Sequence, residues 1–175
     1  MKKNSKIVIL LSSIAFSFSS IALESDSSQP IHVSSQSQHA QMKKNVVIFF
    51  NNVLLTQGSM KLTANKLTVT RSAKAHHETM LAEGNPATFY RTLDDKRPVN
   101  AEAKRIYYDV ANAKITLTGD AQVKQLTSQV NGEKIIYYLH SQELIVKSGT
   151  GKNARVKTIL LPSQFEKKKK TTKKK

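Results

Sequence analysis

The residues of this chain that could do chemistry come in isolated pairs. His76 and His77 are adjacent, which suggests a metal site. Adjacent residues on a strand point to opposite faces, however, and no carboxylate or third histidine lies at a recognisable ligand spacing. We therefore interpret the pair as solvated loop histidines.

A second pair, Asp94-Asp95, could serve acid–base chemistry, but it stands beside Lys96 and Arg97 in LDDKRP, a stretch typical of an exposed charged turn. The chain has no cysteine, which removes thiolate ligands, cysteine nucleophiles and disulfides. It also lacks G-x-S-x-G, H-E-x-x-H and a phosphate-binding glycine loop. We expect a protein that is not an enzyme and has no catalytic residue, metal or cofactor.

The elements that surround these pairs indicate an all-β protein. Met60–Thr63 and Leu67–Thr70 each alternate apolar with polar residues, the period of a strand with one buried face. Val46–Phe50 is apolar on both faces, which indicates either a central strand or a strand whose second face meets another layer. Ser34–Gln41 could hold a turn or a weak strand, and Arg71–Gly84 is interpreted as a long loop or one helical turn.

Turn signals divide the strands. Asn51-Asn52 and Gln57-Gly58 tolerate the positive φ of tight turns, and Asn112-Ala113 is a further signal. Gly119-Asp120 and Asn131-Gly132 are the two strongest hairpin signals in the chain. These signals predict successive antiparallel strands that are joined by tight turns.

The pattern recurs after 68 residues, where Asn51-Asn52-Val53 aligns with Gly119-Asp120-Ala121 and Lys66-Leu67 aligns with Lys134-Ile135. A third copy of the last piece is Lys104-Arg105-Ile106. Such self-similarity predicts an array of β units, each burying its apolar face against its neighbours.

The first 22 residues are typical of a secretory signal peptide. Three lysines precede the uncharged run Ile7–Ala22, and Ser20 and Ala22 are small residues at the −3 and −1 positions of a cleavage site after Ala22. The alternative is an uncleaved membrane anchor, since the run approaches the lower end of spanning length.

The remaining chain predicts one domain with flexible ends. Residues 23–29 are polar and Ser-rich, residues 30–165 carry the β pattern, and residues 166–175 are a polylysine tail that we expect to be disordered. The formal charge of +16 falls to about +6 once the three lysines of the signal segment and the seven of the tail are set aside. A basic body favours an anionic partner, and export argues against nucleic acid.

Inward-facing apolar residues along the strands allow two interpretations. They could form a packed core, or an apolar groove that holds acyl chains, and periodicity alone does not separate the two. Ile106, Tyr108 and Val110 share one face of their strand. The other residues of the set are Ile31, Val33, Met60, Leu62, Leu67, Val69, Phe89, Ile135 and Tyr137.

Several short segments follow one another in order from about Gln29 to Gln164: Gln29-Pro30-Ile31-His32-Val33, Asn45-Val46-Val47, Val53, Thr56-Gln57-Gly58, Pro86-Ala87-Thr88-Phe89-Tyr90, Leu117-Thr118-Gly119, Arg155-Val156-Lys157-Thr158 and Leu161-Pro162-Ser163-Gln164. Together these segments resemble the periplasmic lipopolysaccharide transport protein A (LptA, OstA) family. Where relatives have Gly-Asn-Val turns, this chain has Lys44-Asn45-Val46 and Asn51-Asn52-Val53, and asparagine also tolerates the left-handed region.

The resemblance implies a twisted antiparallel β-jelly roll, open at both ends and apolar inside. It implies a periplasmic protein that binds lipopolysaccharide, shields the acyl chains, and bridges an inner-membrane-anchored LptC-like domain to an outer-membrane LptD-like assembly. The family's lipid-contacting positions correspond to Ile31, Phe89, Ile106 and Val110. Together with the alternation above, the candidate lipid-binding residues are Ile31, Val33, Met60, Leu62, Leu67, Val69, Phe89, Ile106, Tyr108 and Val110.

The edges of such a sheet predict self-association. Ile31-His32-Val33 and Val156–Leu161 would present unpaired backbone groups at opposite ends, guarded only by Pro30 and Pro162. Two different edges that pair generate open filaments. The alternative function is a stand-alone periplasmic β-domain that binds an anionic membrane or glycolipid surface through basic residues.

Overall fold

The computed structural model describes residues 29–72, 77–93, 95–151 and 154–160. The expected signal peptide, all but the last residue of the flexible mature N-terminus, and the polylysine tail lie outside these described residues. A short 3-10 helix, Met42–Lys44, precedes β3. The strands are β1 (His32–Ser34), β2 (Ser37–Gln41), β3 (Val46–Gln57), β4 (Met60–Thr70), β5 (Thr79–Thr92), β6 (Pro98–Asp109), β7 (Lys114–Gln125), β8 (Ser128–Tyr138), β9 (Glu143–Lys147) and β10 (Lys157–Ile159).

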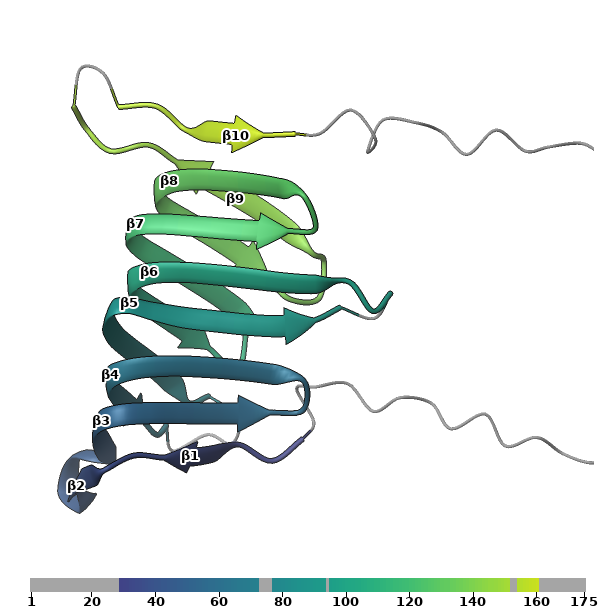
Figure 1. Cartoon of the computed structure of the whole chain (residues 1–175). Coiled ribbons are helices and arrows are strands. Elements are labelled where there is room, and N and C mark those ends of the chain that lie inside the picture. The colour runs from purple at the N-terminus through teal and green to yellow at the C-terminus, as the bar shows by residue number, and fades with distance from the viewer. Residues whose placement is uncertain (1–28, 73–76, 94, 152–153, 161–175) are drawn as a thin grey trace, which may run out of the picture.

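All described strands belong to one antiparallel sheet in the order β1-β3-β4-β5-β6-β7-β8-β10. β2 pairs with the first half of β3, and β9 pairs with the second half of β8. Figure 1 shows the long strands stacked in chain order, curling back on themselves without closing into a barrel. The all-β antiparallel architecture is confirmed.

The long strands are interrupted along one line that crosses the sheet. The pairing register shifts at residues 51–52 in β3, 64–65 in β4, 84–86 in β5, 103–104 in β6 and 119–120 in β7. Extra residues of this kind bend a strand and increase its local twist. The line of bulges therefore folds the sheet into two half-sheets that enclose the interior.

We call these half-sheets A and B. Half-sheet A contains β1, β10 and the segments 53–57, 60–63, 87–92, 98–102, 121–125 and 128–132. Half-sheet B contains β2, β9 and the segments 46–50, 66–70, 79–83, 105–109, 114–118 and 134–138.

Each bend keeps the apolar face of its strand turned inward. In β4 the buried positions are Met60, Leu62 and Ala64 before the bend and Leu67 after it, so the alternation changes phase by one residue. The same change occurs in β6 between Ala103 and Ile106. Because successive strand residues face opposite sides, the extra residue is what lets both halves bury their apolar side chains in one interior.

Three of the predicted turns are wrong, because the strands continue through them. Asn51-Asn52 and Gly119-Asp120 have positive φ, as expected, but they form bulges inside β3 and β7 rather than hairpins. Asn131-Gly132 lies within β8, opposite β7. A Cβ on Gly132 would lie 2.6 Å from Val146 Cγ1, so this glycine permits the close approach of β9.

Some of the other predicted elements are confirmed and others are wrong in part. Turns at Gln57-Gly58 and Asn112-Ala113 are confirmed. The charged turn predicted for Leu93–Pro98 is confirmed at Asp95 and Lys96, whereas Pro98 already begins β6. Val46–Phe50 belongs to a strand that is paired on both sides. Ser34–Gln41 contains the last residue of β1 and all of β2, so of the two alternatives, a turn or a weak strand, the strand is confirmed. The loop predicted for Arg71–Gly84 is wrong from Thr79 onward, because pairing with β4 and β6 extends β5.

The 68-residue repeat is confirmed in the strand register. The pairs Phe50↔Lys66 and Val53↔Ala64 of the β3–β4 hairpin correspond to Thr118↔Lys134 and Ala121↔Gly132 of the β7–β8 hairpin, each 68 residues later. Both hairpins end on equivalent turns, at Gln57↔Met60 and Gln125↔Ser128. The repeating unit is thus a bent hairpin.

Asp109 holds the turn between β6 and β7. Its carboxylate accepts hydrogen bonds from the Asn112 backbone N–H at 3.2 Å and from Asn112 Nδ2 at 2.8 Å, and Lys114 Nζ lies 3.8 Å away. Partial burial alone would raise the pKa of Asp109, but the hydrogen bonds from Asn112 and the positive charge of Lys114 outweigh it and hold this pKa below its usual value.

Because the folded-state pKa of Asp109 is lowered, its carboxylate stabilises the fold above its unfolded-state pKa, and this contribution disappears as pH falls through the folded-state pKa. We expect Asp109→Asn to lower the free energy of unfolding by about 1 kcal/mol at neutral pH, as for a charge-assisted hydrogen bond. Urea unfolding at pH 7 and at pH 3 measures the difference, which should shrink at the lower pH.

Asp120→Asn is the matched control. Asp120 forms an exposed ion pair with Lys104 at 2.7 Å, and asparagine keeps its tolerance of positive φ. Its effect should stay within about 0.5 kcal/mol. Equal losses in the two variants would contradict the role of Asp109 in the turn.

Candidate functional site

The candidate lipid-binding residues fall into two groups in the structure. Met60, Leu62, Leu67, Phe89, Ile106 and Tyr108 are buried in one cluster with Ile135 and Tyr137. Ile31, Val33, Val69 and Val110 are only partly buried and pack against that cluster. Both interpretations of the apolar interior therefore hold in part, because a packed centre is bordered by apolar side chains that are only partly buried.

A cavity of about 540 Å³ opens at the β1–β2 end of the fold. Its apolar lining includes three of the candidates, Ile31, Val33 and Val69, and its polar lining is Gln38, Arg71 and Glu78. Such a cavity, lined by both apolar and polar side chains, suits a ligand with a hydrocarbon part and a polar part.

Sequence reasoning missed three apolar residues of this cavity. Val47 and Phe49 line it from β3, and Met80 lines it from β5. The run Val46–Phe50 is apolar at every position, so its pattern does not indicate which face points inward. Met80 lies in the segment that was interpreted as a loop. The partner strands decide both cases, because they determine the face to which each side chain points.

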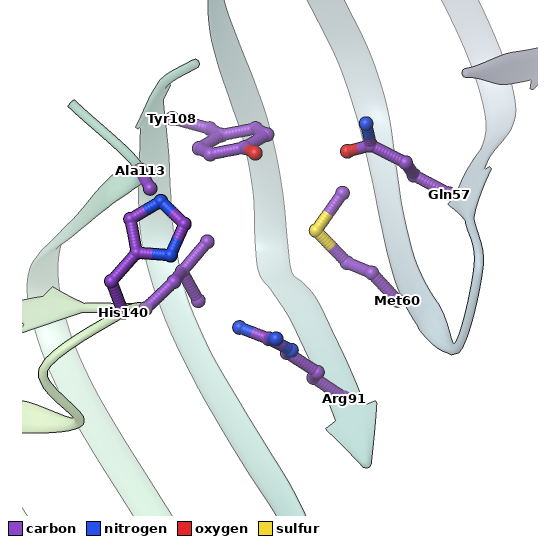
Figure 2. A pocket seen from close by; sticks show the side chains of 7 residues that line it. Gln57, Met60, Arg91, Tyr108, Ala113 and His140 are labelled. Carbon is purple, nitrogen blue, oxygen red and sulfur yellow. The ribbon is translucent and has the colours of Figure 1, made fainter. Parts of the chain in front are cut away.

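Each half-sheet has one edge at the line of bulges and an opposite edge where its strands end in turns. The opposite edges of half-sheets A and B meet along a line that we call the seam, which is lined by the residues of two pockets. One pocket there has only about 10 Å³ of enclosed space and is lined by Gln57, Met60 and Arg91 from half-sheet A and by Tyr108, Ala113, Leu139 and His140 from half-sheet B and its turns. Figure 2 shows these side chains converging from both sides. The half-sheets are thus in close contact at the centre.

A second pocket continues the seam toward β8 and β9. It has a volume of about 200 Å³ and is lined by Leu93, Arg97, Val99, Val123, Gln125, Tyr137, Gln142 and Leu144. Its apolar members again come from both half-sheets. The apolar interior is therefore accessible from the β1–β2 end and from the part of the seam near β8 and β9, and it is packed at the centre between them.

Few polar side chains are buried in the described part of the chain. Gln57 is the one buried polar residue there, at 3 % exposure, and its Nε2 donates to the Gln29 carbonyl at 3.1 Å. No buried side-chain polar atom of the described residues lacks a hydrogen-bond partner. An interior of this kind stabilises hydrocarbon and excludes charge.

The pairs that suggested chemistry do not form a reactive centre in the described residues. His77 is exposed, whereas His76 and Asp94 lie outside the described residues. Asp95 is exposed, and the hydrogen bond that the Arg97 side chain donates to its carboxylate lowers the pKa of this group. No group of three or more His, Asp or Glu side chains that could hold a metal occurs among the described residues. Nor does any helix in that part of the chain have the length and apolarity to cross a membrane.

The comparisons with known proteins agree with this geometry. The family model of the LptA/(LptD N-terminal domain) LPS transport protein matches residues 32–143. The chain belongs to this family. The match covers most of the bent-hairpin array, from β1 to the start of β9.

Individual members of the LptA family align over nearly the whole chain. The lipopolysaccharide export system protein LptA of Haemophilus influenzae is 42 % identical over 165 residues, which are 93 % of this chain and 95 % of that protein. LptA of Escherichia coli K12 is 38 % identical over 166 residues, 94 % of this chain and 89 % of that protein.

A solved structure shares the fold. The crystal structure of LptH, the LptA homologous periplasmic component of the lipopolysaccharide transport device of Pseudomonas aeruginosa, superposes with a TM-score of 0.72 at 29 % identity. The match covers 78 % of this chain and 99 % of that chain. The expected jelly-roll fold of the LptA family is confirmed.

The two groups of candidates should respond differently to truncation. Ile106 is fully buried, so Ile106→Ala should lower the free energy of unfolding by about 2–5 kcal/mol through lost burial and a cavity. Val69 is half-buried at the cavity, so Val69→Ala should cost less than about 1.5 kcal/mol. Urea unfolding measures both, and equal costs would contradict the division into a packed centre and an open end.

Proposed function

We propose that the protein carries lipopolysaccharide through the periplasm to the outer membrane and shields its acyl chains in the apolar interior between the half-sheets. The observation that carries this proposal is the cavity of about 540 Å³ at the β1–β2 end, because it leads directly onto the buried apolar cluster. The names of the LptA relatives, which are lipopolysaccharide export system proteins, support it. They do not favour the alternative of a stand-alone domain that binds an anionic surface.

The acyl chains first meet Ile31, Val33 and Val69, which are partly exposed at the cavity. Each buried methylene of a chain contributes about 0.8 kcal/mol, so affinity requires many methylenes of several acyl chains to enter the apolar interior. Deeper contacts with Phe89 and Ile106 require the half-sheets to move apart, since the centre is packed. The protein performs no catalysis in this scheme.

The periplasm follows from the expected signal peptide at residues 1–22, with cleavage after Ala22. There the protein bridges an LptC-like domain anchored in the inner membrane and an LptD-like assembly in the outer membrane. The family model supports the second partner, because it groups LptA with the N-terminal domain of LptD. A partner of the same fold would present similar sheet edges.

The sheet edges allow end-to-end stacking that continues both half-sheets. β1 and β10 lie at opposite edges of half-sheet A, and β2 and β9 at opposite edges of half-sheet B. All described pairings are antiparallel, so β10 runs opposite to β1, and β9 runs opposite to β2. A second copy placed on the first would form two antiparallel pairs in line with the rest of the sheet.

Photo-crosslinking tests the lipid path. With lipopolysaccharide added to the purified mature chain, a crosslinker at Val69 or Ile106 should label the lipid, because both positions face the interior. A crosslinker at Lys61, which is exposed on the outer face of β4, is the control and should stay unlabelled. Labelling at Lys61 alone, or a chain that stays lipid-free in this mixture, would contradict the proposal.

Light scattering over a range of concentrations tests the stacking. Ile159 in β10 is 53 % exposed at the free edge, so Ile159→Lys should shorten concentration-dependent oligomers by placing a charge at the contact. Leu126, 52 % exposed in the β7–β8 turn, provides the matched control Leu126→Asn, which should leave oligomer length unchanged. A strict monomer at every accessible concentration, with and without lipid, would rule out the bridge.

A further inference from the structure

A hollow of about 240 Å³ lies on the outer face of half-sheet A, over the strands β5, β6 and β7. Figure 1 shows these three strands side by side in the middle of the stack. Phe89, Ala101 and Val123 are buried in the interior, so the residues that alternate with them along each strand point outward. The hollow, which we call the outer hollow, is therefore separate from the apolar interior.

The strand register brings six polar side chains together around the outer hollow. They form two rows across the strands, one of Tyr90, Asn100 and Lys124 and one of Thr88, Glu102 and Gln122. Side chains directly opposite each other on neighbouring strands have Cβ atoms about 4.5–5.5 Å apart. A small ligand in the outer hollow can therefore contact residues of both rows at once.

The outer hollow offers hydrogen-bond donors and acceptors next to each other. Gln122 Nε2 donates to Glu102 Oε1 at 3.2 Å, so the Gln122 amide oxygen and the second Glu102 oxygen can accept from a ligand. Asn100 carries both a donor and an acceptor, whereas Lys124 carries donors alone. Asn100 and Lys124 are exposed.

Tyr90 adds an aromatic ring to this polar set. Its hydroxyl lies 3.2 Å from Thr92 Oγ1, a hydrogen bond that fixes the orientation of the ring. The side chain is half-buried, so part of the ring stays in contact with solvent. An aromatic ring of this kind packs against the C–H groups on one face of a sugar ring, because both surfaces are apolar and both have polar groups at their rims.

The mixture of groups favours an uncharged, hydroxyl-rich ligand. Glu102 repels a phosphate and Lys124 repels a metal ion, and a hydrocarbon would displace water from these polar groups without replacing its hydrogen bonds. A hydroxyl group both donates and accepts, so it can bond to either kind of side chain. The volume lies just below the range of about 300–1,000 Å³ for drug-sized ligands, which suits a smaller ligand such as one sugar ring.

We propose that the outer hollow is a carbohydrate-binding site, which takes one sugar ring of an oligosaccharide against Tyr90 and bonds its hydroxyls to Asn100 and Glu102. This inference does not rest on the proposed function, because the outer hollow lies outside the interior that would hold acyl chains. Its strands are also the central ones of the sheet, so copies that stack through the terminal strands leave it open.

Two oligosaccharides of the periplasm share this chemistry, and the test distinguishes them. One probe is the oligosaccharide of lipopolysaccharide with its lipid removed, and the other is a short β-linked oligomer of N-acetylglucosamine, which represents cell-wall glycan. Saturation-transfer NMR with the full mature chain should show contact with at least one probe, and the probe that binds identifies the source. We expect a Kd on the order of 1 mM, because a shallow site makes few contacts.

Variants of Tyr90 test the place of binding. Tyr90→Ala should weaken binding by about ten-fold, whereas Tyr90→Phe keeps the ring and should weaken it less. The matched control is Tyr107→Ala, because Tyr107 is 37 % exposed on the outer face of β6 in half-sheet B, and it should leave the affinity unchanged. Asn100→Ala should also weaken binding, and thermal unfolding shows which variants are folded.

Variants of the two charged residues test the class of ligand. For a sugar bound through its hydroxyls, Lys124→Gln and Glu102→Gln should each change the affinity by less than about three-fold, since exposed charges contribute little. Loss of binding in Lys124→Gln with no effect of Tyr90→Ala would identify an anion site and overturn the proposal.

The remaining outcomes separate this inference from the proposed function. Absence of contact with both probes would overturn the carbohydrate site and leave the lipid-carrying function standing, because photo-crosslinking from Val69 and Ile106 tests that function independently. Equal losses in Tyr90→Ala and Tyr107→Ala would show general adhesion of sugars to the surface and would also overturn the site.

Discussion

The structure depends on keeping one apolar face turned inward across a bent sheet. A strand of alternating residues can bury only one side, and a sharp bend would otherwise direct half of its apolar residues to solvent. The line of bulges prevents this, because the extra residues at each bend shift the alternation so that apolar side chains face inward on both sides of it, as between Ala64 and Leu67 in β4. The buried cluster, the cavity at the β1–β2 end and the seam all follow from that single line.

The same constraint links fold to function. An interior bounded by two half-sheets of one continuous sheet has ends that differ from its middle, since each terminal strand is short and pairs with only one half of β3 or β8. The short strands β1 and β2 leave Ile31, Val33 and Val69 partly exposed, whereas Leu67 and Ile106 are fully buried among longer neighbours. Access for a hydrocarbon chain is therefore a property of the ends and the seam.

Most of the elements could be predicted from the sequence, because period-2 alternation is a local signal. The inward set from Met60 to Tyr108 is buried or packed against the core, and the 68-residue repeat appears as equivalent hairpins. The errors occur where local signals have two solutions. A positive φ at Asn51-Asn52 or Gly119-Asp120 suits a hairpin turn and a bulge equally well, and only the pairing with neighbouring strands decides between them.

The sequence by itself determined the all-β class, the antiparallel repeat, the inward faces and the resemblance to the LptA family, since each depends on residue type and spacing along the chain. Tertiary structure decided that the interior is packed at its centre and open at the β1–β2 end, because that depends on which strands cover which. It also brought Arg91 and His140 to one pocket from opposite half-sheets. No spacing in the sequence encodes that meeting, which arises only when the sheet folds across its bulges.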